Sequence, residues 1–240
     1  MILLERIRKG LLHTVYPAKC FHCSSSLPSN PPYLCQTCAS HLDLIQPHGR
    51  CPFCFQFLEE GHIHCSKCHK TSNPYFRIGA ALDYTGPVTT LVKHLKYYGK
   101  PYLAKGMAAF MFAQFDIFKW PMPDVLIPVP QSWMHRLERG YNQSTLLAEE
   151  MGRFLNCPVL HALKRRSGHF SQAALSLEQR KQLSTNQFKR NLKHSFEGKK
   201  LLVIDDVMTS GLTLKRCGEA LMEGNPEVLY ALTFSHTGQE

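Results

Sequence analysis

From residue 77 onward, segments with the apolar pattern of a strand alternate with segments that have the apolar pattern of a helix. Short apolar runs with the length of buried strands occupy 77–84, 124–130, 201–206 and 228–234. Segments with helical spacing lie between them at 87–115, 142–155 and 213–224. The first helical segment is interrupted by the turn "YYGKP", and Asn142 or Ser144 is expected to cap the second. This alternation predicts an α/β domain with a parallel sheet that binds ligands at the carboxyl ends of its strands.

The first 72 residues differ in composition, with many Pro, Ser, Gly and His residues and no long apolar run. They contain eight of the ten cysteines, all in CxxC pairs separated by loops of 11 and 10 residues. Two CxxC turns brought together by a short hairpin provide four thiolates for one tetrahedral ion. The spacing therefore predicts two structural zinc sites, one formed by Cys20, Cys23, Cys35 and Cys38 and the other by Cys51, Cys54, Cys65 and Cys68.

Other uses of the cysteines are a redox relay, an iron–sulfur cluster, or one zinc with four spare thiols. The redox relay is disfavoured because no βαβ pattern surrounds the pairs. Cys157 and Cys217 are expected to be free thiols. Turn-forming residues cluster at 70–76, so we expect a double zinc-ribbon domain over 1–72 and an α/β domain over 73–240.

The formal net charge of +10 is concentrated in one segment. Between Lys164 and Lys193 there are eight basic residues and a single acid, Glu178. Such a segment suggests a polyanionic partner, although a solvated flexible tract has the same composition. Phe170 and Phe188 are its only aromatic residues, so it offers no evident platform for stacking bases.

The apolar runs of the sequence do not indicate a membrane protein. No apolar run reaches the roughly 18 residues that a membrane-spanning helix needs. Charged residues interrupt the first apolar stretch, "MILLERIRKGLLH", which argues against a signal peptide and favours a short amphipathic helix. We therefore expect a cytoplasmic protein.

The stretch "LLVIDDVMTSGLTL" carries the most specific chemistry. Asp205 and Asp206 follow an apolar strand, where carboxylates can accept hydrogen bonds from a vicinal diol. A small turn follows, in which glycine lets backbone N–H groups approach an anion and the next helix adds its dipole. That turn comprises Thr209, Ser210, Gly211, Leu212 and Thr213. Diol acceptors next to a phosphate cradle predict a site for a ribose 5-phosphate.

This stretch resembles the ribose-phosphate loop of type I phosphoribosyltransferases at every position. The block "DVLIPVPQSWMHRLERGYNQSTLLAE" is similar to that of the ComF family of competence-associated proteins, which join an N-terminal cysteine-rich zinc domain to such a domain. The helix "KHLKYYGK" and the segment "SQAALSLEQR" extend the likeness to nearly the whole chain. The resemblance implies a type I phosphoribosyltransferase fold with a Rossmann-like parallel sheet.

Residue roles follow from this resemblance. Asp205 and Asp206 are expected to bind the ribose hydroxyls of phosphoribosyl pyrophosphate, directly or through Mg²⁺, while 209–213 hold the 5-phosphate. The pyrophosphate loop corresponds to 127–130, including Val129 and Pro130. Arg136 and Arg139, just beyond it, are expected to neutralise diphosphate or else to pair only with Glu138 or Glu149. A mobile hood, 164–190, brings Arg180 to the pyrophosphate when it closes.

Two positions depart from the relatives. Thr209 stands where purine-salvage enzymes often carry a base-contacting acid, so no general base is assigned, and Leu183 stands where ComF relatives often carry asparagine.

Three functions fit these features. The first is transfer of ribose 5-phosphate from phosphoribosyl pyrophosphate to an acceptor that the sequence does not identify. The second, implied by the ComF resemblance, is non-catalytic binding of single-stranded DNA during DNA uptake, together with uptake proteins such as a helicase. The third is a regulator that senses phosphoribosyl pyrophosphate.

Overall fold

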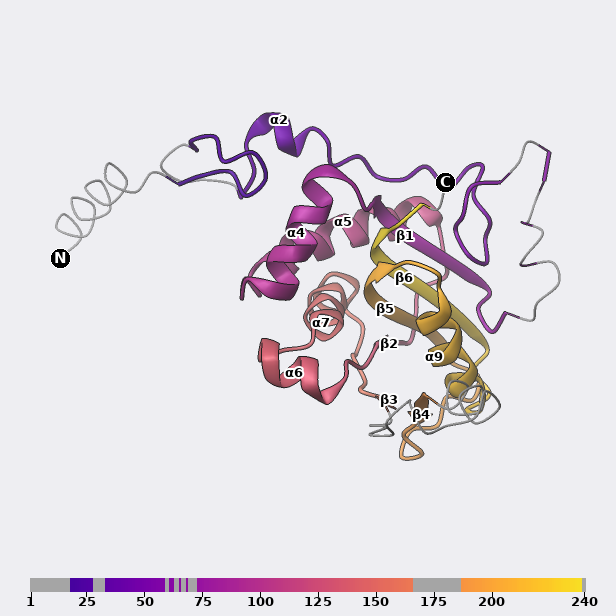
Figure 1. Ribbon diagram of the computed structural model, residues 1–240. Helices are drawn as coiled ribbons and strands as arrows, with labels where there is room; N and C mark the ends of the chain where they lie inside the picture. The colour runs from indigo at the N-terminus through magenta and orange to yellow at the C-terminus, as the bar shows by residue number, and fades with distance from the viewer. Residues whose placement is uncertain are drawn as a thin grey trace, which may run out of the picture.

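The computed structural model describes residues 18–27, 33–58, 61–62, 65, 68, 73–165 and 187–238. The elements of the α/β region, in chain order, are β1 (Arg77–Asp83), α4 (Gly86–Tyr97), α5 (Leu103–Phe118), β2 (Val125–Pro128), α6 (Trp133–Arg139), α7 (Gln143–Leu155), β3 (Leu163–Arg165), β4 (Phe188–Arg190), β5 (Lys200–Met208), α9 (Leu212–Met222) and β6 (Val228–His236) (Figure 1). A four-residue helix, α2 (Gln36–Ala39), lies within the cysteine-rich part. None of the helices in these described ranges is both long and apolar enough to span a membrane.

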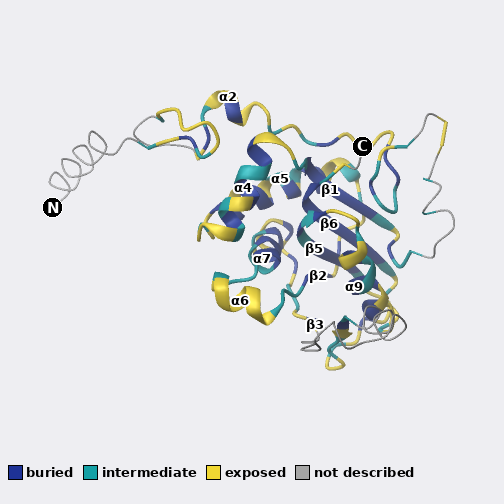
Figure 2. Cartoon of the chain, viewed as in Figure 1, coloured by how far each residue is buried: buried dark blue, intermediate teal, exposed yellow. Residues whose placement is uncertain are grey.

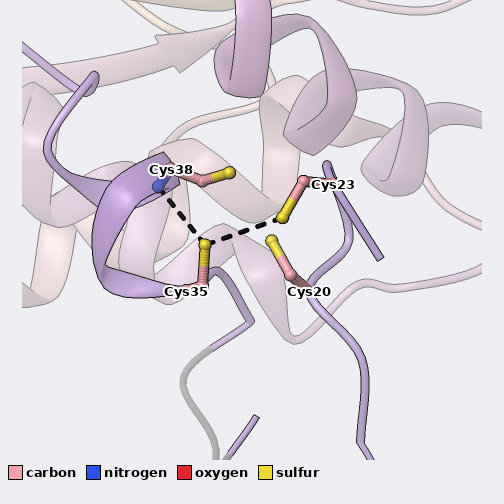
Figure 3. A group of neighbouring side chains, drawn as sticks. All are labelled: Cys20, Cys23, Cys35 and Cys38. Atoms are coloured by element: carbon pink, nitrogen blue, oxygen red, sulfur yellow. Dashed lines mark hydrogen bonds between the residues drawn. The ribbon is translucent and has the colours of Figure 1, made fainter. Parts of the chain in front are cut away.

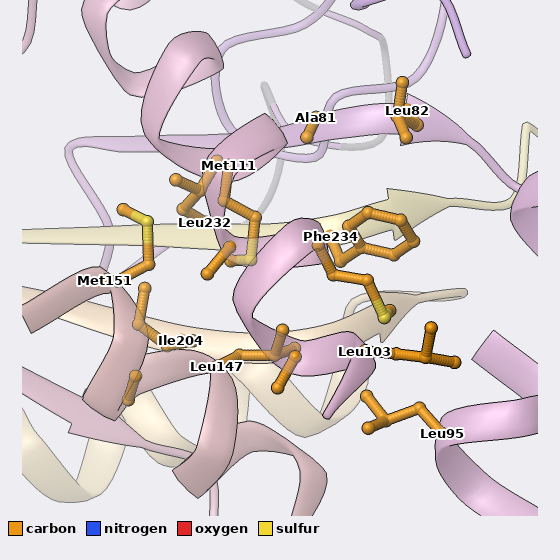
Figure 4. Packing of buried hydrophobic residues seen from close by; sticks show 14 of the residues in the cluster. Ala81, Leu82, Leu95, Leu103, Met111, Leu147, Met151, Ile204, Leu232 and Phe234 are labelled. Carbon is orange, nitrogen blue, oxygen red and sulfur yellow. The ribbon is translucent and has the colours of Figure 1, made fainter. Parts of the chain in front are cut away.

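The main sheet has four strands in the order β1-β6-β5-β2, and every neighbouring pair is parallel. One face packs against α4, α5 and α7 through a buried cluster that includes Leu95, Met111, Met151 and Leu232 (Figure 4). The other face packs against α9 through a second cluster, which includes Leu221. Burying both faces of the central strands explains their nearly continuous apolar sequences (Figure 2).

Each strand and helix expected in the α/β region is present, with a few shifted ends. Asn142 caps α7 by accepting a hydrogen bond from the backbone N–H of Ser144 at 3.2 Å. The expected strand 201–206 runs further, to Met208, because β6 continues beside it to His236. The acid pair, expected where the strand meets the following loop, therefore lies two residues before the end of the strand. Helix α9 ends at Met222, two residues before the expected Gly224.

Two features were not expected from the sequence pattern. Helix α6 fills the stretch between the "IPVP" turn and α7. Ser132 caps its start by accepting a hydrogen bond from the backbone N–H of His135, and Gly140, whose φ of 77° favours glycine, caps its end. Strands β3 and β4 form a separate antiparallel pair at the two ends of the basic segment.

Candidate ligand site and cysteine clusters

The acid pair lies at the carboxyl end of β5, where each carboxylate has a different partner. Ser144, at the start of α7, donates its hydroxyl to Asp205 Oδ1 at 2.7 Å. Lys96, near the end of α4, places Nζ 3.1 Å from Asp206 Oδ2, and the side chain of Asp206 is only 10% exposed. Two helices from one face of the sheet thus hold the two acids in fixed positions.

The surroundings of Asp205 favour its protonated form. Burial and the charge of neighbouring Asp206 raise the pKa of Asp205 to about 7. The bonds from Ser144 and from the backbone N–H of Asp206, together with the charge of Lys96, act in the opposite direction but do not cancel these effects. Asp205 therefore changes its charge near neutral pH, where a small change in its surroundings is enough to shift the balance.

The turn after β5 is open to solvent. Thr209, Ser210, Leu212 and Thr213 are exposed, and Gly211 has a φ of 71°, a conformation that favours glycine. Gly211 is the N-cap of α9 and has no side chain to cap the helix, while the backbone N–H of Leu212 donates a long hydrogen bond of 3.5 Å to the hydroxyl of Ser210. The amide groups at this helix end therefore face an accessible space lined by hydroxyl groups, which suits an anion.

The "IPVP" turn lies directly beside the acid pair. Pro128 pairs with Ile204, and the backbone N–H of Val129 donates to the carbonyl of Ile204 at 3.0 Å. Asn142 donates to the carbonyl of Val129 at 2.9 Å, which fixes this turn against the start of α7. Pro130 follows and is half-buried. Two segments that are far apart in the sequence therefore meet at one edge of the sheet.

Arg136 and Arg139 are both on α6, next to this edge. Among the ion pairs of the described residues, neither arginine is joined to Glu138 or Glu149, and Glu138 pairs instead with His135. Arg139 donates to Gln143 at 3.4 Å, and its guanidinium lies 4.8 Å from the ring centre of Tyr97. Most of the predicted hood, including Arg180, lies outside the described residues.

The cysteines form two groups of four, as the spacing predicted. Within each group all sulfur atoms lie within 4.8 Å of one another. The first group contains Cys20, Cys23, Cys35 and Cys38 (Figure 3), and the second contains Cys51, Cys54, Cys65 and Cys68. The sulfurs of Cys23 and Cys35 are 3.7 Å apart, close to the edge of about 3.8 Å of a tetrahedron with metal–sulfur bonds of about 2.3 Å.

The chemistry of both groups suits a metal ion. The backbone N–H of Cys38 donates to the sulfur of Cys35, and that of Cys68 donates to Cys65, both at 3.4 Å. Such bonds stabilise a thiolate, which is the form that binds metal. Donor type, number and spacing therefore fit one four-coordinate ion in each group. Cys157 and Cys217 are buried, separate from both groups, and not in a disulfide.

Sequence reasoning missed the two residues that hold the acids. Ser144 was expected only as a possible helix cap, and Lys96 was noticed only as part of the helix "KHLKYYGK". Neither pairing has a local signal, because each joins segments that are distant along the chain.

Comparison with known proteins agrees with this arrangement. Residues 142–239 match the family model for the phosphoribosyl transferase domain. Competence protein F of Haemophilus influenzae is 26% identical over 209 residues, which cover 85% of this chain and 90% of that protein. DNA utilization protein YhgH of Salmonella typhi is 28% identical over 213 residues, covering 86% and 91%. A solved structure of glutamine phosphoribosylpyrophosphate amidotransferase from B. subtilis aligns with a TM-score of 0.40 and 21% identity, over 55% of this chain and 26% of that one.

The parallel sheet and the family match define a protein with a type I phosphoribosyltransferase domain. With two four-cysteine clusters ahead of that domain, the chain is similar along most of its length to the competence proteins of the ComF family.

Proposed function

We propose that this protein binds phosphoribosyl pyrophosphate at the carboxyl end of β5 and transfers its ribose 5-phosphate to an acceptor, in a role connected with DNA uptake. One observation carries the proposal: an acid pair at the end of β5 leads, within one strand–turn–helix unit, to a helix start that has glycine at its N-cap and exposed hydroxyl groups around it. The names of the relatives, which refer to competence and DNA utilization, support the biological setting.

Different residues bind different parts of the ligand. The carboxylates of Asp205 and Asp206 accept hydrogen bonds from the ribose hydroxyls, while 209–213 hold the 5-phosphate through backbone amides and hydroxyl groups. Lys96 leaves the acid pair with a net charge of −1 when both acids are ionised. Because the ligand is itself strongly anionic, this partial neutralisation reduces its repulsion from the acids.

The transfer breaks the bond between ribose C1 and the pyrophosphate oxygen, whose electron pair leaves with pyrophosphate, and it forms a bond between C1 and the nucleophilic atom of the acceptor, which releases a proton to solvent. Positive charge develops on the ribose ring, where nearby carboxylates stabilise it. The turn at Val129 and Pro130, with Arg136 and Arg139 beyond it, faces the leaving group, and Arg180 is proposed to join them. Bound Mg²⁺ supplies a counter-charge for the diphosphate.

The two cysteine groups are proposed to hold one structural zinc ion each. Four thiolates close the coordination shell, so neither ion has an open position for a substrate. We take 1–72 as the zinc-binding unit and 73–240 as the transferase unit. The metal sites support the chain rather than take part in the transfer.

Titration calorimetry with Mg²⁺ and phosphoribosyl pyrophosphate tests the site. Replacing both acids, Asp205→Asn and Asp206→Asn, removes charge-assisted hydrogen bonds worth roughly 1.5–3 kcal/mol each, so binding should weaken by on the order of 10²-fold or more. The melting temperature should change little, because relief of the burial and like charge of the pair offsets the loss of the ion pair between Lys96 and Asp206. Asp116→Asn is a matched control, since Asp116 is exposed and pairs only with nearby Lys119 among the described ion pairs.

A fall in melting temperature with unchanged affinity would show that the acids are a scaffold and would overturn the proposal. A pyrophosphate-release assay over purine bases, pyrimidine bases and amines then separates transfer from binding alone. Release with one acceptor identifies the reaction. Tight binding without release over the whole panel would favour a protein that senses or holds phosphoribosyl pyrophosphate.

A further inference from the structure

Helix α6 carries two arginines, and only one of them is held in place by its neighbours. The side chain of Arg136 is exposed and makes no hydrogen bond or ion pair with the described residues. Arg139 is half-buried, and its guanidinium contacts side chains from three other segments of the chain. A side chain that is fixed in advance loses less conformational freedom when a ligand binds, so Arg139 is the better placed of the two to bind an anion.

The amide oxygens of two glutamines converge on one nitrogen of Arg139. Nη1 donates to Oε1 of Gln143 at 3.4 Å. Gln131, with its amide in the orientation that satisfies its neighbours, accepts from the same Nη1 at 2.8 Å and donates to the carbonyl of Tyr141 at 3.1 Å. Gln131 directly follows the "IPVP" turn, and Gln143 is the first residue of α7 and is only 3% exposed. The guanidinium is therefore tied to both segments that meet beside the acid pair.

The ring of Tyr97 covers the guanidinium of Arg139. The centre of this ring lies 4.8 Å from Cζ of the arginine, and such a ring attracts the cation and restricts its motion. Tyr97 is the last residue of α4 and is 66% exposed, so burial of the ring does not account for its position. Tyr141, between α6 and α7, donates its hydroxyl to the carbonyl of Leu95 at 2.7 Å, which fixes the loop that follows Arg139 against the same end of α4.

The contacts of Arg139 leave one edge of its guanidinium available. Both hydrogen-bond acceptors are uncharged and meet only Nη1, so among the described residues Nη2 and Nε have no acceptor and no acid neutralises the arginine. The N–H groups of Nη2 and Nε lie side by side in the guanidinium plane, which is the geometry that binds two phosphate oxygens at once. The ring of Tyr97 lies over the plane rather than at this edge, so it does not compete with a phosphate.

The same two helix ends also hold the acid pair. Lys96, which precedes Tyr97, pairs with one acid, and Ser144, which follows Gln143, donates its hydroxyl to the other. The last turn of α4 and the first turn of α7 therefore set the positions of both the acids and the arginine. The spacing between the negative and the positive part of the site is fixed by the fold before any ligand binds.

We propose that Tyr97, Gln131 and Gln143 are positioning residues that hold Arg139 for the diphosphate of the ligand. The held arginine makes the site select a ribose 5-phosphate that carries a diphosphate at C1 over ribose 5-phosphate alone. This inference rests on the proposed function, because it concerns the same ligand. It assigns the diphosphate to Arg139 in preference to Arg136 and gives Tyr97 a role that no local sequence signal indicates.

Titration calorimetry of the full-length, metal-loaded protein with Mg²⁺ and either phosphoribosyl pyrophosphate or ribose 5-phosphate tests the selection. Tyr97→Leu should weaken binding of phosphoribosyl pyrophosphate roughly fivefold and leave that of ribose 5-phosphate unchanged, while Tyr97→Phe keeps the ring and should bind as the unchanged protein does. Arg139→Gln should cost on the order of 30-fold for the diphosphate ligand alone, and Arg136→Gln should cost less. Tyr98→Leu is the matched control, because Tyr98 is 61% exposed but lies against His94.

A double variant separates positioning from a general effect on the fold. Once Arg139→Gln has removed the guanidinium, adding Tyr97→Leu should cause no further loss, and Gln131→Ala should shift the ratio of the two affinities in the same direction as Tyr97→Leu. A loss that persists in the double variant, or that is equal for both ligands, would overturn the positioning role. Unaltered binding of phosphoribosyl pyrophosphate by Arg139→Gln would overturn this inference alone, whereas failure of the unchanged protein to bind that ligand would overturn the proposed function as well.

Discussion

The first and second cysteine clusters are built on the same backbone turn but pack against different parts of the α/β domain. In each, the first cysteine donates its N–H to a carbonyl five residues later at 2.8 Å, from Cys20 to Ser25 and from Cys51 to Gln56. Antiparallel bridges flank both turns, and the residue that follows each first CxxC pair has a φ of 61°. Each residue of the first turn therefore has an equivalent residue in the second.

The second cluster is joined to the edge of the sheet. Arg50, which precedes the first cysteine of this cluster, is only 7% exposed. Its Nη2 donates to Oδ1 of Asp83 at 3.1 Å and to Oδ2 at 3.2 Å. The backbone N–H of Ile78 in β1 donates to the carbonyl of Pro52 at 2.8 Å. Phe55 is buried within the cluster that covers one face of the sheet. This turn therefore protects an edge strand and extends the core.

The first cluster is joined to a helix instead. Phe21 stacks on His94, and His22 Nδ1 lies 2.9 Å from the hydroxyl of Thr90, both on α4. The same helix carries Lys96, which pairs with Asp206. One metal-binding turn thus supports the sheet, while the other contacts the helix that holds one acid of the ligand site. Residues next to the cysteines make these contacts, and Cys20 and Cys38 are themselves part of the first buried cluster.

The largest difference should appear when one metal ligand is removed from each cluster. Cys54→Ser and Cys23→Ser change equivalent positions, and each should reduce the zinc content by one equivalent. Cys54→Ser should cost more than about 3 kcal/mol in the free energy of unfolding of the whole chain, because loss of a structural metal also releases Phe55 and Arg50 from the sheet. Cys23→Ser should affect unfolding less and the affinity for phosphoribosyl pyrophosphate more.

Metal analysis, thermal melts and titration calorimetry measure these quantities on the same samples. Equal losses of stability in the two variants, with no difference in affinity, would contradict a division of roles between the clusters. A zinc content of one equivalent or less in the unchanged, folded protein would refute the two sites themselves.

A smaller effect is expected from the residue that precedes each first cysteine. Arg50→Ala leaves Asp83 without its guanidinium and removes packing against Phe57, whose ring centre lies 3.9 Å from the arginine. Urea unfolding should show a loss of about 2 kcal/mol, because a buried arginine loses its packing and its two hydrogen bonds to Asp83, whose side chain is 45% exposed. Lys19→Ala is the matched control, because Lys19 occupies the same position in the first turn but is exposed. It should change stability by no more than about 0.5 kcal/mol, and a similar loss in both variants would argue against the sheet-supporting role.

The sequence allowed prediction where the signals were local. The metal ligands follow from CxxC spacing, and the acid pair with its glycine turn follows from one continuous strand–turn–helix stretch. Helix α6 was missed although Ser132 and Gly140 are ordinary start and stop signals, because its seven residues bury none of their side chains and so show no helical pattern. The partners of the clusters could not be predicted, because Arg50 meets Asp83, and Lys96 meets Asp206, only after the chain has folded.

Lys96 connects α4, the helix that the first cluster contacts, to the acid pair. Lys96→Gln should weaken binding of phosphoribosyl pyrophosphate about tenfold, a change of about 1.4 kcal/mol, because the anionic ligand then meets two uncompensated acids. The pKa of Asp205, about 7 through burial and the charge of Asp206, is no longer lowered by a nearby positive charge and should rise. If binding requires ionised Asp205, affinity increases with pH through this pKa, and the midpoint should move to higher pH in the variant.

Calorimetry across pH 5.5–9, on the order of two units either side of this pKa, measures both effects. Lys93→Gln is the control, since Lys93 is exposed on the same helix and has no ion pair among the described residues. An unchanged midpoint in Lys96→Gln would show that the lysine does not act on the acid pair in solution.

The smallest expected effect concerns the contact between the first cluster and α4. Thr90→Val keeps the size of the side chain but removes the hydroxyl that lies 2.9 Å from His22. An exposed hydrogen bond contributes about 0.5–1 kcal/mol, so the zinc affinity of the first cluster should fall roughly two- to fivefold, while that of the second stays the same. Competition with a chromophoric chelator measures both affinities, and Thr89→Val, one residue earlier, controls for the added apolar group. The stacking of Phe21 on His94 remains in this variant, which explains why the loss should be modest. A larger fall, or one shared by the second cluster, would mean that the metal sites are coupled through the domain as a whole rather than through their separate contacts.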